Sequence, residues 1–424
     1  MRKVLLYSIL LVLGLAGSQM LPGALGAAWQ GASETVRLLT MWALGFIMIH
    51  VGYEFEIDRR RPRSYAVDYG VAMTAAAFPW IFAALWFLLL MMPPGSIADF
   101  KAWKEALLVG RFAAPTSAGI LFSMLAAAGL SATWVFRKAR VLAIFDDLDT
   151  VLLMIPLKAM MVGLRWQLAV VVVIMAVMLW VAWRWLHRVR IPVSWPWVLG
   201  YAAGIVAVSE AIYRFSKLID DVVPIHIEVL LPAFVLGCVL ARPAGCDPHG
   251  DDAREGHQEG PESSGEQRVA TLISGAFMVL VGLSMPTLLG AGAGAGGAGA
   301  VADASAGTAG AAAAGGGPAL GWLALALHVI GLTVVINLGK MFSFFCYRRE
   351  ATWRERLAVS IGMWPRGEVG AGVLVLSLSY GVGGAAVTVA IASLALNLLL
   401  TGVFIVAVKR LIQGSPAPDA APGA

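Results

Sequence analysis

The chain alternates between long apolar stretches and short polar connections. A membrane-spanning helix needs about 20 consecutive, mostly apolar residues. Twelve stretches of the sequence fit that length, at residues 4–26, 34–53, 66–92, 106–128, 137–163, 166–186, 193–213, 224–241, 269–290, 319–346, 355–381 and 383–408. The pattern therefore predicts an all-α polytopic membrane protein with about twelve transmembrane helices.

The first stretch has a second interpretation. The segment MRKVLLYSILLVLGLAGSQ begins with basic residues and continues with an apolar run, as a secretory signal peptide does. Apolar character resumes directly afterwards in MLPGALGAAW. We therefore favour a first helix that is retained.

Basic residues are distributed unevenly over the connections. They gather in every second connection, for example in RRRPR at 59–63 and in the connection that holds Arg348 and Arg349. Positively charged connections mark the cytoplasmic side of a membrane protein. With an even number of helices, this distribution predicts that both termini lie in the cytoplasm.

Composition supports a lipid environment. Hydrophobic residues make up 59% of the 424 residues and charged residues only 13%, about half the charged share of a typical soluble domain. The net charge of +5 does not indicate a nucleic-acid partner, because the basic residues stand at segment ends. We find no nucleophile–base set, P-loop or dinucleotide motif, so we expect neither an enzyme nor a cofactor.

Three other segments differ from the helices. Residues 242–268 are rich in acids, Gly, Ser and Pro and are expected to form a flexible cytoplasmic connection. Their Cys246, His249 and His257 match no metal-ligand spacing, so no metal site is predicted. Residues 291–318 contain almost only Gly and Ala and indicate an external linker, and residues 411–424 indicate a disordered tail.

Polar residues interrupt the apolar pattern at four places, the first of which is RFAAPTSAGI at 111–120. Pro115 removes a backbone donor and weakens the helix, while Thr116 and Ser117 supply hydroxyl groups. Broken helices at membrane depth occur where the backbone lines a cavity. The alternative is a kinked helix whose hydroxyl groups bond to its own carbonyl groups. Arg111 at the start of this stretch is expected to reach toward the membrane surface.

The second place is AIFDDLDTVLLMIPL at 143–157, which carries Asp146, Asp147 and Asp149. Each carboxylate costs about 2.5–3.5 kcal/mol inside a membrane. Asp146 and Asp147 point about 100° apart on a helix, and Asp149 lies one turn beyond Asp146. Intramembrane acids mark ion or proton pathways; the alternative is a structural ion pair.

The third and fourth places bring positive charge into apolar segments. Lys340 lies in VVINLGKMFSFF at 334–345 and is expected either to pair with an acid or to titrate near neutrality. Arg366 and Glu368 lie in GMWPRGEVGAG at 362–372, where Pro and Gly make a continuous helix improbable. Because arginine stays charged, Arg366 is predicted to have an acidic partner: Glu368, Asp149 or the Asp pair.

The motifs PRGEVG and APTSAGI and the Asp-Asp helix resemble those of bacterial sodium/proton antiporters of the monovalent cation:proton antiporter superfamily, in the branch with an Asp-Asp motif. FIMIHVGYEFEID at 46–58 and FMVLVGLSM at 277–285 are similar to the second and ninth helices of that family. The resemblance runs from residue 4 to about residue 409.

The resemblance implies inverted repeats and a homodimer in the bacterial inner membrane. Residues 1–65 and 191–290 would form a dimerisation domain, and residues 66–190 and 319–410 a core transport domain. Helices 4 and 11 of the core would be broken and would cross near the Asp pair.

The resemblance also implies roles for single residues. Asp147 would bind a monovalent cation, with Na⁺ favoured, and would release it on protonation. Asp146 would pair with Lys340, and Thr116 and Ser117 would lie at the crossing. Exchange would be electrogenic; a K⁺/H⁺ antiporter and a sodium-coupled symporter of organic anions are the alternatives.

The chain departs from the family at LDT, which follows the Asp pair where the family has small or aliphatic residues. Asp149 is expected either to satisfy Arg366 or to alter ion preference.

Overall fold

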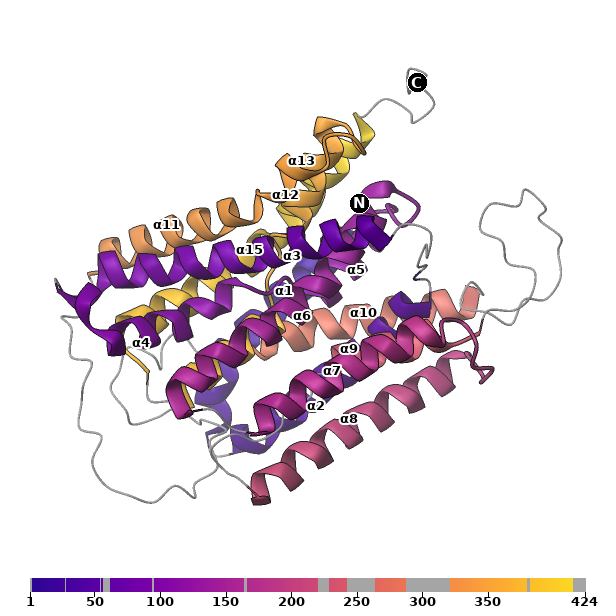
Figure 1. The fold of residues 1–424 in the computed structure, drawn as a ribbon, viewed down its shortest axis with the longest axis horizontal. Coiled ribbons are helices and arrows are strands. Elements are labelled where there is room, and N and C mark those ends of the chain that lie inside the picture. Colours follow the sequence, from indigo (N-terminus) through magenta and orange to yellow (C-terminus); the bar gives the residue numbers. More distant parts are fainter. Residues whose placement is uncertain are drawn as a thin grey trace. The chain divides into compact units, whose positions relative to one another are not determined.

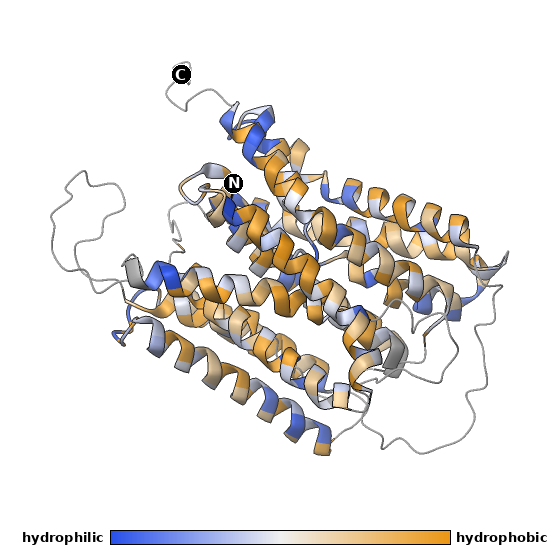
Figure 2. Cartoon of the chain, turned by 180° about the vertical axis from the view of Figure 1, so that it is seen from behind, coloured by the Kyte–Doolittle hydropathy of each residue, from blue (hydrophilic) through white to orange (hydrophobic). Residues whose placement is uncertain are grey.

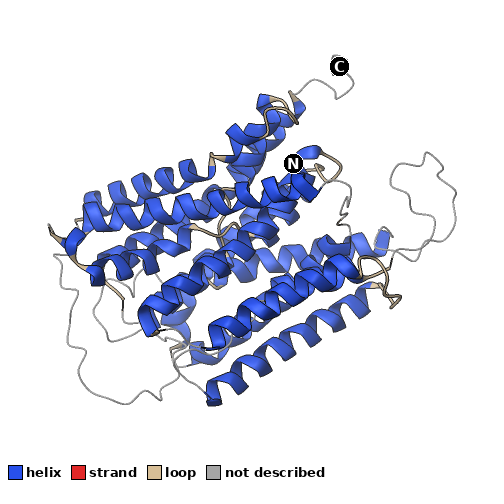
Figure 3. Cartoon of the chain, viewed as in Figure 1, coloured by secondary structure: helices blue, strands red, loops and turns tan. Residues whose placement is uncertain are grey.

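The computed structural model describes residues 2–26, 28–53, 55, 62–93, 95–163, 166–219, 229–241, 264–286, 321–379 and 382–414. These residues form helices and no strand (Figure 3). The α-helices are α1 (Arg2–Leu25), α2 (Ala28–Tyr53), α3 (Pro62–Trp86), α4 (Phe100–Gly110), α5 (Ala118–Ala127), α6 (Trp134–Val162), α7 (Trp166–Arg184), α8 (Trp195–Ile219), α9 (Leu230–Val239), α10 (Ser264–Leu283), α11 (Trp322–Lys340), α12 (Ser343–Cys346), α13 (Trp353–Gly362), α14 (Glu368–Ser379) and α15 (Ala385–Gln413). Three short helices, η1 (Phe87–Met91), η2 (Ser96–Ala98) and η3 (Arg111–Ala113), complete the described part.

Helix length and hydropathy agree with the predicted segments. Nine helical segments of the described part are long and apolar enough to cross a membrane, and Figure 2 shows apolar residues along most helices. The other three predicted segments correspond to α6, which carries the three Asp residues, to the ten-residue α9, and to the pair α13 and α14. The predicted all-α polytopic fold class is confirmed.

The chain divides into two compact units, each built from segments distant in sequence. Unit 1 comprises Met1–Glu34, Arg61–Leu157 and Val281–Ala424, and unit 2 comprises Thr35–Arg60 and Lys158–Leu280. These bounds differ from the predicted domains because α1 packs against α5 and α15 in unit 1, while α7 packs against α9 in unit 2. The assignment of transport and dimerisation to separate domains stays a prediction.

Within unit 1, α11 lies beside α3 and also packs against α15 (Figure 1). A Cβ on Gly339 would stand 2.8 Å from the backbone nitrogen of Pro79, so only glycine allows α11 and α3 to approach this closely. Lys340 follows directly and is fully buried. The packing of α11 on α3 therefore fixes the position of the lysine.

Within unit 2, the segment after α7 is attached to the end of α9. His187 has a positive φ of 53°, and its backbone N–H donates to the Cys238 carbonyl at 2.9 Å. Its two ring nitrogens lie 3.0 Å from the Leu240 carbonyl oxygen and 3.1 Å from that of Phe55. The contacts hold this otherwise strained backbone in place.

The predicted connection at 242–268 lies outside the described residues except for the first turn of α10. The whole linker at 291–318 and the tail beyond Gly414 also lie outside them. Cys246, His249 and His257 therefore also lie outside them.

Candidate functional site

Two helices of unit 1 are interrupted in the middle, as predicted. The first passes from α4 through η3 into irregular backbone at Ala114–Ser117 and continues as α5. The second ends with α13 at Gly362 and resumes as α14 at Glu368. Pro115 and Pro365 lie in the two breaks, where their missing N–H groups do not interrupt a helical hydrogen-bond ladder.

The two breaks contact each other directly. The Ser117 N–H donates to the Pro365 carbonyl at 2.9 Å, and the Thr116 hydroxyl donates to the Met363 carbonyl at 3.0 Å. A Cβ on Gly367 would stand 3.1 Å from the Ser117 Oγ. Because Thr116 bonds to the opposite helix, the alternative of a continuous kinked helix is wrong, and the predicted crossing is present.

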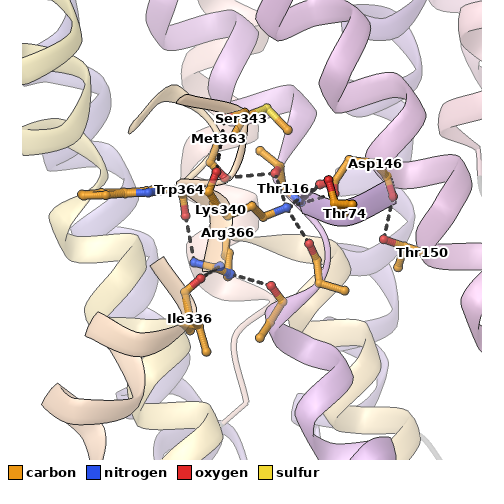
Figure 4. Close-up of polar contacts among 12 residues, drawn as sticks. Thr74, Thr116, Asp146, Thr150, Ile336, Lys340, Ser343, Met363, Trp364 and Arg366 are labelled. Atoms are coloured by element: carbon orange, nitrogen blue, oxygen red, sulfur yellow. Dashed lines mark hydrogen bonds and ion pairs between the residues drawn. The ribbon is translucent and has the colours of Figure 1, made fainter. Parts of the chain in front are cut away.

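A buried ion pair lies against this crossing. The Lys340 Nζ is 2.9 Å from Oδ1 and 2.8 Å from Oδ2 of Asp146, and neither side chain has exposed surface. The same ammonium donates to the Ala114 carbonyl at 2.7 Å and to the Thr116 hydroxyl at 3.0 Å (Figure 4). Asp146 also accepts from the Thr116 N–H at 2.7 Å. The arrangement expected from the family resemblance is therefore present, and every group in it is satisfied.

Arg366 is also fully buried, but its described partners are not carboxylates. Its guanidinium donates to the carbonyl groups of Ala113 at 3.0 Å, Ile336 at 3.1 Å and Trp364 at 3.1 Å. It also donates to Asn337 Oδ1 at 2.5 Å. The expected partnership with Asp149 is therefore wrong; the side chain of Glu368 lies outside the described part.

The physical reason for this correction is the broken helices themselves. A helix leaves its last four carbonyl groups without intrahelical partners and carries partial negative charge at that end. Ala113 is the last residue of η3, and Trp364 follows the end of α13 by two residues, so both carbonyl groups lie at the helix breaks, whereas Ile336 lies within α11, four residues before its end at Lys340. Backbone carbonyl groups thus accept the hydrogen bonds that the sequence assigned to a carboxylate.

The two amide side chains of Asn337 and Asn397 extend this network and were missed by the sequence analysis. Both are buried. One orientation of the Asn397 amide gives hydrogen-bond partners to both its nitrogen and its oxygen. In that orientation the nitrogen donates to the Trp364 carbonyl at 2.9 Å, and the oxygen accepts from the Asn337 amide nitrogen at 3.1 Å. A polar amide within the apolar runs VVINLG and ALNLLL was the available signal.

The other two acids of α6 are buried as well. Asp147 is 4% exposed and Asp149 1% exposed. Lys340 makes its ion pair with Asp146, from which Asp147 is turned by about 100° around the helix. Asp149 accepts a hydrogen bond from the hydroxyl group of Tyr69 on α3, a residue that the sequence analysis did not single out.

Arg111 was predicted to reach toward the membrane surface, and this prediction is wrong. It is buried and donates to the Thr150 carbonyl on α6 at 2.9 Å. The hydroxyl group of Thr150 in turn donates to the Asp146 carbonyl at 2.7 Å. Arg111 therefore links the first broken helix to the helix that carries the acids.

No family model matches the chain, and no curated protein matches it. Among solved structures, the fold is similar to the sodium/proton antiporter MjNhaP1 from Methanocaldococcus jannaschii at pH 8. The alignment covers 96% of this chain and 92% of that chain, with a TM-score of 0.53 and 12% sequence identity. At this identity the likeness shows the fold, which is the one that the motif resemblance implied.

Proposed function

We propose that this protein is a secondary active antiporter that exchanges a monovalent cation for protons at Asp147. The observation that carries the proposal is the crossing of two broken helices against the buried Asp146–Lys340 pair, with the Asp147 carboxylate on the next residue. The likeness to the fold of a sodium/proton antiporter supports it.

The exchange needs no covalent chemistry. A buried carboxylate is costly when it is charged, and either a proton or a cation neutralises it. The neutralised site can change its exposure between the two sides of the membrane, whereas the empty charged site stays in place. Competition between proton and cation at one carboxylate then couples the two flows.

The Asp146–Lys340 pair accounts for an electrogenic exchange in this proposal. A cation at Asp147 adds positive charge near the Lys340 ammonium, which favours loss of a proton from the lysine. More than one proton then leaves for each cation that binds. The proposed cation is Na⁺, with K⁺ as the alternative within the same mechanism.

We also propose that the chain acts as a homodimer in a bacterial inner membrane with both termini cytoplasmic. The distribution of basic residues over the connections and the resemblance to the antiporter family favour this. Cations and protons would be its partners, and no cofactor would take part.

A sodium-coupled symporter of organic anions is the second candidate on a similar broken-helix fold. Purified protein in liposomes that enclose a pH-sensitive dye separates the two. Added Na⁺, K⁺ or Li⁺ should dissipate an imposed proton gradient without any organic solute. A requirement for an organic anion would support the symporter instead.

The Asp147→Asn variant assigns the cation carboxylate. It keeps the size of the side chain and removes the charge, so cation-dependent loss of the gradient should disappear while the melting temperature in detergent is retained. Glu105→Gln is a matched control because Glu105 is a partly exposed acid on α4. Normal exchange by Asp147→Asn would contradict the assignment.

A further inference from the structure

Asn397 is a fully buried amide in the middle of α15. A buried amide is costly unless both its nitrogen and its oxygen have hydrogen-bond partners. Its neighbours along α15 are apolar, as in LALNLLL, and the partners of the amide come from the second break and from α11. The amide therefore connects α15 to a break of which α15 is not a part.

The amide closes a ring of hydrogen bonds on the second break. In the orientation that satisfies both amide atoms, the Asn397 nitrogen donates to the Trp364 carbonyl at 2.9 Å, and the oxygen accepts from Arg366 Nη1 at 3.1 Å. The same Nη1 donates to the Trp364 carbonyl at 3.1 Å. Carbonyl, guanidinium and amide thus satisfy one another, and two donors hold the Trp364 carbonyl at once.

Three consecutive carbonyl groups of the second break have partners on different elements. The Met363 carbonyl accepts from the Thr116 hydroxyl at 3.0 Å. The Pro365 carbonyl accepts from the Ser117 N–H at 2.9 Å. Both donors belong to the first break, whereas the Trp364 carbonyl between them takes part in the ring of hydrogen bonds. Residues 364–367 are not helical, so this ring, and not a helical ladder, fixes the peptide unit between the two carbonyl groups that the first break uses.

The first break carries this constraint to the buried ion pair. The Thr116 N–H donates to Asp146 at 2.7 Å, and the Thr116 hydroxyl accepts from the Lys340 ammonium at 3.0 Å. That hydroxyl also donates to the second break, so the position of Thr116 is set from both sides. A continuous series of hydrogen bonds therefore runs from Asn397 to Asp146, the residue next to the proposed cation carboxylate of Asp147.

We infer that Asn397 is a positioning residue of the transport site: it fixes the second break and thereby the place of Thr116 beside the buried ion pair. It acts on the cation through these residues. A binding site works only when supporting residues hold its groups within about 0.5 Å of the productive geometry. Loss of the amide should therefore weaken cation binding. The inference rests on the proposed function and adds a residue outside the two broken helices to the determinants of cation affinity.

Exchange kinetics in liposomes test the inference with Asn397→Leu, which keeps a similar size and removes the amide. The Na⁺ concentration for half-maximal exchange (K⁺ or Li⁺ if the wild type prefers one of them) should rise about 5- to 10-fold, the equivalent of one buried hydrogen bond. A purely structural role would lower the amount of folded transporter, and so the maximal rate, without moving this concentration. Asn397→Ser is the second variant; its hydroxyl is too short to replace the amide, and it should raise the same concentration.

Phe404→Leu is the matched control for packing. Phe404 lies on α15 two turns beyond Asn397, and its ring packs edge-on against that of Trp364 with the centroids 5.1 Å apart. The variant loosens a contact with the same break and leaves the amide in place. It should lower the melting temperature in detergent without changing the half-maximal concentration. Thr401→Val, which removes a buried hydroxyl bonded to the Asn397 backbone carbonyl, should also leave that concentration unchanged.

The outcomes separate this inference from the proposed function. An unchanged half-maximal concentration in Asn397→Leu, or in Asn397→Ser where the leucine variant does not fold, overturns the inference. An equal rise in Phe404→Leu overturns it as well. In either case exchange by the wild type still supports the proposed function, whereas absence of wild-type exchange with Na⁺, K⁺ and Li⁺ would overturn both.

Discussion

The Lys340 ammonium lies 2.8 Å from a carboxyl oxygen of Asp146, and neither side chain reaches the surface. Burial of two charges costs several kcal/mol for each ion, and the pair is retained only if additional hydrogen bonds complete it. The Thr116 N–H and hydroxyl groups and the Ala114 carbonyl supply these bonds. The break in the helix between α4 and α5 therefore stabilises the ion pair, because a continuous helix would not offer these backbone groups.

Replacement of Lys340 by Gln should destabilise the protein by about 3–5 kcal/mol, since it leaves the buried Asp146 without its partner. Thermal melting of the variant and the wild type in the same detergent measures the loss.

The double variant Lys340→Gln/Asp146→Asn is the matched control. It removes both charges and should recover much of the lost stability. Equal stability losses for the single and double variants would contradict a direct pair.

Replacement of Arg366 by Gln should lower stability by about 3 kcal/mol or more, because several buried carbonyl groups lose a charged donor. Arg366→Lys should recover only part of the loss, since an ammonium lacks the planar fork of the guanidinium. Arg214→Gln is the control: Arg214 is a mostly exposed arginine paired with Glu210 within α8 and should cost less than about 1 kcal/mol. Similar melting of Arg366→Gln and wild type would contradict the described network.

Apolar patterning predicted the helices well, because a membrane helix must satisfy its backbone internally and shows this as a long apolar run. The two breaks were also predictable, since Pro115, Pro365 and the nearby glycines disfavour a continuous helix. The acids and Lys340 were recognisable because each is costly in an apolar segment.

The partners of Arg366 were not predictable in the same way. The sequence shows carboxylates but not which backbone carbonyl groups are freed and turned toward a guanidinium. Tyr69 was missed for a related reason, because a tyrosine in a membrane helix is common and its hydrogen bond to Asp149 depends on how α3 packs against α6. Contacts between distant elements, not the composition of either element, decide both cases.

A second buried ion pair joins α3 to α6 within unit 1. The Lys138 Nζ lies 3.0 Å from Asp68 Oδ1 and 3.0 Å from Glu350 Oε2, and the Tyr347 hydroxyl donates to Asp68 at 2.9 Å. Burial, together with the negative charge of Asp68, raises the pKa of Tyr347, so its hydroxyl group keeps the proton that it donates. The three groups together satisfy the lysine and the aspartate.

Replacement of Lys138 by Met should therefore cost about 3–5 kcal/mol, because Asp68 stays buried without its cation. Lys101→Met provides the control, since Lys101 is largely exposed and lies 3.9 Å from Glu105 in the same turn of α4. That variant should change stability by less than about 1 kcal/mol. Comparable melting temperatures for the two variants would show that the Lys138 pair does not hold α3 and α6 together.

Two glycines next to the second break should respond to alanine in opposite ways. A Cβ on Gly367 would stand 2.8 Å from Ile120 Cδ1 and 3.1 Å from Ser117 Oγ, whereas a Cβ on Gly372 meets nothing within 4 Å. Gly367→Ala should thus push the crossing helices apart and destabilise by about 1–3 kcal/mol. Gly372 lies inside α14, and Gly372→Ala should stabilise the protein by about 0.5–1 kcal/mol, because alanine loses less backbone freedom than glycine when the helix forms.

Thermal melting of both variants in the same detergent tests the contrast. If Gly367→Ala melts at or above the temperature of Gly372→Ala, the two breaks do not pack as closely as described, and the placement of Ser117 against the second break is wrong.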